Sequence, residues 1–263
     1  MPFPPSDRVI YSKNPLKEVI CQLRFPTILE IGSEPPALFQ KKIRATYPLY
    51  EKGEAPLPKE IAEILAQFPI PKPSEGISHK FLTADSNRFI SLASGFVALT
   101  DHKYQRWEQF RRELVLAQTS LEEVYQPTFY SRIGLRYRDV IDKEEIGLGN
   151  EPWDSLLNSP LIGLLGASNI GGHVRTIQTE ASIKIDEVPG GFATLRHGLG
   201  PPSQGEKPVY VIDVDLYTNE RSSGNDVSSI LDRFNRIVGN LFRWAISSKL
   251  HQALEPRAIG PEE

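Results

Sequence analysis

Two aspartates, Asp213 and Asp215, stand two positions apart in an otherwise apolar run of the sequence. On a β-strand this spacing puts both carboxylates on one face, as in the phosphoryl-transfer sites that hold Mg²⁺. No third acid and no phosphate-binding loop accompanies the pair, so pairing with arginines of neighbouring strands is the favoured interpretation. A magnesium-dependent nucleotide or nucleic-acid enzyme that uses Asp213 and Asp215 remains an alternative function.

Arginines form the second group that could do chemistry. Their planar guanidinium groups offer paired donors that suit carboxylates and phosphates. Sorting the expected strand residues by alternation places them on one sheet face together with acids. The predicted binding residues on this face are Arg24, Arg132, Arg136, Arg138, Arg196, Asp213 and Asp215, and Glu180 and Lys184 accompany them.

Two interpretations of this polar face stay open. Its arginines and acids could simply pair across strands in contact with water, or the face could dock a partner protein, a second copy of the chain or an anionic ligand. The mixture of signs favours a protein over nucleic acid, although a nucleic-acid-binding protein remains a further alternative. A separate interface residue is predicted at Trp244, which falls beside the main apolar stripe of the last helix.

Other motifs give no catalytic residue. The glycine-rich stretch 163–172 lacks the Gly-Lys-Ser/Thr ending of a phosphate-binding loop. The five histidines are scattered without metal-ligand spacing, and no Gly-x-Ser-x-Gly elbow is present. We therefore assign no catalytic residue, no metal ligand and no cofactor. Whether the protein is an enzyme stays open, and a non-catalytic role is favoured.

The elements that would position these residues follow the same order twice. The first half predicts a strand at 17–25, a helix after Ser33, a short helix at 58–68, strands at 78–83, 88–93 and 96–100, and a helix at 105–125. The second predicts a strand at 129–138, a broken helix at 153–164, strands at 173–186, 191–197 and 208–218, and a helix at 227–254. Alternation with a period of two supports the strands, and apolar residues three and four apart support the helices.

This order predicts an α+β fold of two tandem β-α-βββ-α pseudo-repeats, residues 1–126 and 127–263, that form one structural whole. The long helices would pack on one face of antiparallel sheet and leave the other face polar. Leu23-Arg24-Phe25 in the first half matches Leu135-Arg136-Tyr137 in the second, which is a faint sequence echo of the repeat.

Composition limits the class of protein. Hydrophobic residues make up 40% of the chain and charged residues 24%, which is normal for a globular protein. The net charge of −3 argues against a strongly cationic nucleic-acid binder. Cys21 is the only cysteine, so no disulfide forms within the chain. The N-terminal residues do not read as a signal peptide and no apolar run is long enough to span a membrane, so we expect a cytoplasmic protein.

Residues 14–26, from Asn14 to Pro26, and residues 132–137, from Arg132 to Tyr137, resemble motifs of a sporadically distributed, uncharacterised family of prokaryotic proteins of similar length. Tyr104-x-x-Trp107 and Leu231-Asp232-x-Phe234-Asn235 fit the same pattern. The resemblance carries over no catalytic residue. The patchy distribution of that family implies an accessory role in a phage-defence or toxin–antitoxin-like system, with another protein or a second copy as the partner.

Overall fold

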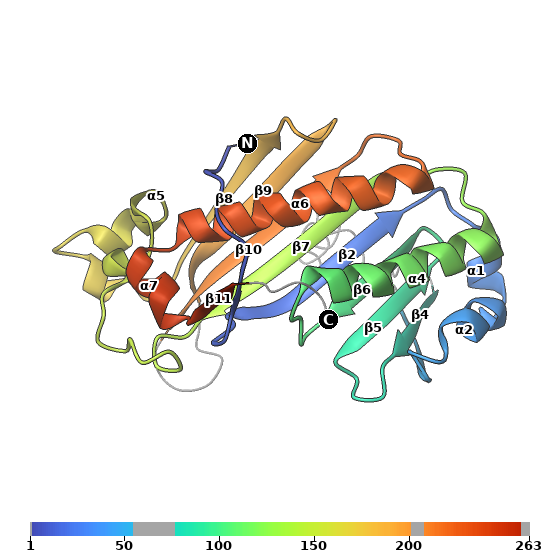
Figure 1. Cartoon of the computed structure of the whole chain (residues 1–263), viewed down its shortest axis with the longest axis horizontal. Coiled ribbons are helices and arrows are strands. Elements are labelled where there is room, and N and C mark those ends of the chain that lie inside the picture. Colours follow the sequence, from blue (N-terminus) through green and yellow to red (C-terminus); the bar gives the residue numbers. More distant parts are fainter. Residues whose placement is uncertain (1, 55–76, 201–207, 259–263) are drawn as a thin grey trace, which may run out of the picture.

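Nine antiparallel strands form one continuous sheet in the order β3-β4-β5-β6-β2-β7-β10-β9-β8 (Figure 1). The computed structural model describes residues 2–54, 77–200 and 208–258. The fold is α+β, as predicted, and the expected helix at 58–68 lies outside the described residues. In sheet order the strands are β3 (Leu49–Glu54), β4 (Ile77–Leu82), β5 (Arg88–Ala93), β6 (Phe96–Asp101), β2 (Leu16–Arg24), β7 (Arg132–Ile141), β10 (Val209–Thr218), β9 (Gly191–Gly200) and β8 (Ile177–Ile185).

The helices of the described chain lie on one side of this sheet (Figure 1). The long helices α4 (Trp107–Tyr125) and α6 (Gly224–Ala245) run across it, and the short helices α1 (Leu29–Ser33) and α2 (Ala37–Ile43) lie beside α4. A capping box between Ser223 and Asp226 begins α6, because each of these residues satisfies a backbone or side-chain group of the other.

The core lies between the helices and the sheet, and strand register explains why it is continuous. One row of helix-facing residues crosses eight strands without interruption. In order from β4 to β8 its members are Phe81, Ile90, Leu99, Cys21, Leu135, Leu216, Ala193 and Ile183. Seven of the eight are fully buried, and Ile183 on the edge strand packs against the cluster while partly exposed. Along β2, burial at every second position matches the period of two that the sequence predicted.

Two segments far apart in the sequence form a second, small sheet. The N-terminal strand β1 (Val9–Tyr11) pairs with β11 (Pro256–Ala258) in a separate two-stranded sheet. Phe3 packs its ring against Trp244 of α6, with the ring centroids 5.4 Å apart. The segment before β2 is therefore held on α6 and against β11.

Three expectations need correction. The helix expected at 153–164 is a succession of short turns, 3-10 helix Trp153–Ser155, α5 (Ser159–Ile162) and 3-10 helix Gly163–Gly166. The last helix ends at Ala245 and a separate helix, α7 (Ser248–Ala253), follows. The sequence also missed β1, β3 and β11. In the described part of the chain, no helix is both long and apolar enough to cross a membrane.

Candidate functional site

The predicted polar residues do share the sheet face that the described helices leave uncovered. Register makes one row of opposite charges across five strands, from Glu18 on β2 through Arg138, Asp213 and Arg196 to Glu180 on β8. Arg132 and Arg136 lie on the same face as Arg138, because each is an even number of residues away from it along β7. Asp215 likewise lies two residues from Asp213 on β10. The strand parity on which the sequence prediction depended is confirmed.

Four of these side chains form two ion pairs, and each pair has two hydrogen bonds. Arg136 donates to Asp213 from Nε at 2.7 Å and from Nη2 at 2.5 Å, and Arg132 donates to both carboxylate oxygens of Asp215 at 3.2 and 3.0 Å. The Arg136 and Asp213 side chains are only 26% and 11% exposed. The hydrogen bond to Asp213 raises the pKa of Arg136, so the guanidinium stays charged. Paired, half-buried geometry of this kind fixes the orientation of both partners.

Gly134 explains the position of Arg132. A Cβ atom at residue 134 would stand 2.1 Å from Nη1 of Arg132, because the arginine side chain lies back across the glycine. Its guanidinium carbon also sits 4.9 Å from the centre of the Tyr217 ring. The glycine in the Arg-Ile-Gly-Leu-Arg run thus gives Arg132 room to lie along the sheet and reach Asp215.

Two arginines of the polar face lack a carboxylate partner among the described residues. Arg24 donates only to the side-chain oxygen of Gln22, at 3.1 Å, and it lies directly opposite Arg132 in the β2–β7 register. Like charges in directly opposed positions repel. Arg138 is exposed and makes no hydrogen bond or ion pair within the described ranges. In the described part of the chain, the face therefore presents a paired centre and two arginines that no carboxylate neutralises.

The other predicted residues of the face are also accounted for. Arg196 pairs with Glu180, and Lys184 pairs with Asp186 at 2.6 Å on the exposed edge of the sheet. Asp213 and Asp215 each have a guanidinium as their partner, which is the pairing that the sequence favoured over metal binding. In the part of the chain that the structure describes, no group of three His, Cys, Asp or Glu residues is placed to hold a metal ion.

Trp244, predicted as an interface residue, is half-buried. Phe3 covers part of its ring, and its backbone carbonyl accepts a hydrogen bond from Nδ2 of Asn158 at 3.0 Å. The ring thus belongs partly to the packing between the N-terminal segment and α6. Its role in an interface stays a prediction.

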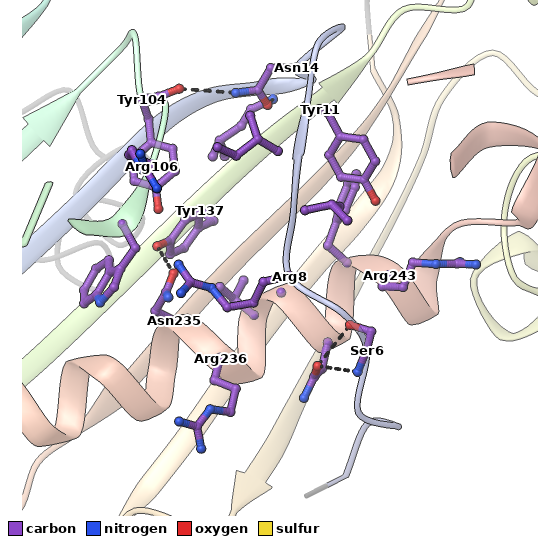
Figure 2. Close-up of a pocket in the computed structure, with 18 of the residues that line it drawn as sticks. Ser6, Arg8, Tyr11, Asn14, Tyr104, Arg106, Tyr137, Asn235, Arg236 and Arg243 are labelled. Carbon is purple, nitrogen blue, oxygen red and sulfur yellow. Dashed lines mark hydrogen bonds between the residues drawn. The ribbon is translucent and has the colours of Figure 1, made fainter. Parts of the chain in front are cut away.

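A second feature, which sequence reasoning missed, is a cavity of about 170 Å³ on the helix side of the sheet (Figure 2). Its floor is β7, one wall is α6, another is the segment that leads into α4, and residues 6–11 pass over it as a roof. Tyr137 on the floor donates from its hydroxyl to Oδ1 of Asn235 at 3.0 Å, and Tyr104 meets the Tyr137 ring edge to face.

Asp139 lies on the floor of this cavity and is only 7% exposed. Its carboxyl group makes no hydrogen bond or ion pair with any residue in the described part of the chain. Burial raises the pKa of Asp139 to about 8, and the charge of Asp213 on the far side of the sheet adds to that shift. The signal in the sequence was an acid that continues the apolar alternation of Ile133, Leu135 and Tyr137.

A comparison with protein-family models gives no match for this chain, and a search of curated proteins gives no significantly similar sequence. The geometry of the two sites is therefore the basis for the proposals that follow.

Proposed function

We propose that the chain is a non-catalytic interaction protein that binds a partner protein through the polar sheet face. The observation that carries the proposal is the arrangement of Arg24 and Arg138, which have no carboxylate partner within residues 2–54, 77–200 and 208–258 and flank a rigid Arg–Asp network. Guanidinium groups held on strands are ready to bind the carboxylates of a partner without reordering the face.

The spacing of the two arginines favours a macromolecule over a small anion. Arg24 lies opposite Arg132, and Arg132 and Arg138 are six residues apart on β7. At roughly 3.3 Å per residue this separates the backbone positions of Arg24 and Arg138 by about 20 Å along the strands. A small ligand would reach one of them, whereas acidic side chains on a protein surface would reach both.

The charge balance favours a protein over nucleic acid. Nucleic-acid surfaces usually carry an excess of lysine and arginine that neutralises several phosphates. Here Glu18, Asp213, Asp215 and Glu180 share the face with the arginines, and the whole chain carries a net charge of −3. A phosphate backbone laid along this face would meet carboxylates as often as guanidinium groups.

The remaining sequence-based expectations belong to the same proposal. Strands β6, β5 and β4 lie outward from β2, and β10, β9 and β8 lie outward from β7, an order that supports descent of the two halves from one duplicated unit. We place the protein in the cytoplasm, as an accessory subunit in a prokaryotic phage-defence or toxin–antitoxin-like system, where its partner is another protein.

The test is capture of a partner by wild-type chain and by two variants. The double variant R24S/R138S removes both free guanidinium groups and leaves the Arg–Asp pairs intact. The control is R44S, which removes an exposed arginine at the end of α2. Tagged protein is recovered from the native host, and captured proteins are identified and quantified by mass spectrometry.

We expect a protein captured by wild type and R44S to fall at least tenfold with R24S/R138S, while all three melt at similar temperatures. Equal capture by R24S/R138S would reject this face as the docking site. Light scattering of the purified chain distinguishes self-association: a dimer that R24S/R138S dissociates would replace the foreign partner by a second copy.

A further inference from the structure

The cavity under the N-terminal segment contains a polar group that the fold does not use. Asp139 is nine-tenths buried, lines the cavity and has no bonding partner among the described residues. Leaving a buried polar group unpaired is costly, so such groups in native proteins usually have a ligand or a function. This site lies on the opposite side of the sheet from the proposed docking face and is independent of it.

The space in this open-mouthed cavity fits one ring-sized group. A dry cavity of roughly 150 Å³ in another protein holds benzene, and the space here is about 170 Å³. Aromatic rings are available on several sides. Tyr11 comes from the roof, Tyr104 from the segment that leads into α4, Trp107 from the first turn of α4 and Phe242 from α6. Flat aromatic walls suit a planar ring, which they can stack against.

Charge around the cavity mouth suits an anion. Four arginines, Arg8, Arg106, Arg236 and Arg243, line it beside one acid, Asp7. Figure 2 shows Arg8 on the roof segment and Arg236 and Arg243 on α6. Arg8 is paired with Glu108 at 2.8 Å, and Arg243 donates to the carbonyl of Ile246 at 3.1 Å. Arg236 is exposed and makes no hydrogen bond or ion pair within the described ranges, so its guanidinium is available to a phosphate.

We propose that this cavity binds a nucleotide, with the base among the aromatic rings against Asp139 and the phosphate at the mouth on Arg236. A nucleobase presents a hydrogen-bond donor beside an acceptor on its edge. A protonated carboxyl group presents the complementary acceptor and donor, and the raised pKa of Asp139 keeps it protonated at neutral pH. Asp139 would thereby gain the partners that the fold withholds.

The test measures binding of AMP and UMP to the full chain at pH 7 by calorimetry, with adenosine, uridine and ribose 5-phosphate as partial ligands. We expect at least one nucleotide to bind and both of its parts to bind at least threefold more weakly. Quenching of the Trp107 fluorescence, in a chain whose other two tryptophans are replaced by Phe, reports occupancy of this cavity.

Variants assign the contacts. D139A should weaken the nucleotide at least tenfold, whereas D139N should stay within about threefold, because its amide still offers a donor beside an acceptor. R236S should weaken the nucleotide to the level of its nucleoside and leave the nucleoside unchanged, and R44S should change neither. The proposal is overturned if neither nucleotide binds, if ribose 5-phosphate binds as tightly as the nucleotides, or if D139A binds like wild type.

Discussion

At the scale of single residues, the raised pKa of Asp139 predicts how the stability of the protein depends on pH. Its folded-state pKa of about 8 lies well above the value near 4 expected in the unfolded chain. Between these two values the folded protein holds one proton more than the unfolded chain. The free energy of unfolding must therefore fall as pH rises through this window, and the contribution of Asp139 is fully present only at lower pH.

The variant D139N removes this proton and keeps the shape of the side chain. We expect wild type to lose about 2 kcal/mol of unfolding free energy relative to D139N between pH 5 and pH 7, because one extra bound proton gives a slope of up to about 1.4 kcal/mol per pH unit. Urea unfolding of both proteins at pH 5, 6, 7 and 8 measures the difference.

Comparing the two proteins cancels the other titrating groups. The charged and titratable groups around Asp139 come from every element packed there, and they stay the same in D139N: Asp7, Arg8, Tyr11, Tyr104, Arg106, Tyr137, Arg236, Arg243 and, through the sheet, Asp213. Parallel pH profiles for the two proteins would contradict the assignment of a raised pKa to Asp139.

At the scale of elements, the sequence predicted the strands and helices whose pattern comes from burial on one face. Strand β7 alternates because Ile133, Leu135 and Tyr137 face the helices, and α4 has an apolar stripe because it lies on the sheet. Such patterns record a local environment, so they can be read from one segment at a time.

The features that the sequence missed lack such a pattern. Strand β3 is at the sheet edge and its residues 49–53 are all exposed, so no alternation between buried and exposed positions reveals it. The turns at 153–166 carry apolar residues at helical spacing, but Pro160, Gly163 and Gly166 break the helix. The cavity unites segments that are more than 200 residues apart, such as Tyr11 and Phe242. Its walls could not be assembled without the fold, although Asp139 alone was visible as an acid on an apolar face.

The edge pair β8–β9 depends on one glycine. Gly198 has a φ of +154°, and a Cβ atom there would lie 1.8 Å from the carbonyl oxygen of Ile177 on β8. Because the obstacle is backbone, it can yield only if β8 moves. We expect G198A to lower the unfolding free energy by about 2–4 kcal/mol, in the range of substitutions that force backbone strain.

The matched control is G200A on the same strand, where the nearest atom to an added Cβ is 3.8 Å away in Val211. G200A should stay within about 0.5 kcal/mol of wild type. Hydrogen exchange of the β8 amides distinguishes local from global effects, and β8 should lose protection first in G198A. Equal stability of the two variants would show that β8 tolerates the added methyl group.

At the scale of the whole molecule, the central pair β2–β7 makes the two halves one body. The row of core residues crosses from Cys21 to Leu135 without a gap, and the polar face crosses it at Arg24 and Arg132. Contacts outside the sheet also join the two halves of the chain. Trp107 at the start of α4 donates to Asp232 of α6 at 2.8 Å, and β1 pairs with β11.

Separated halves should therefore fail to fold alone. Cutting between residues 126 and 127 leaves β2 and β7 as unpaired edges, and it takes Phe3 and β1 away from the helix and strand that they cover. Exposed edges of this kind lead to aggregation. We expect fragments 1–126 and 127–263, each expressed alone, to be insoluble or to unfold without a cooperative transition.

Co-expressed, they should form a soluble one-to-one complex whose circular dichroism matches that of the intact chain. The co-expressed pair separates the effect of the chain break from the effect of the missing half, because it contains the break and restores the β2–β7 ladder. A fragment 127–263 that melted cooperatively by itself would show that the second half has a sufficient core of its own, and that the ladder joins two domains instead of completing one.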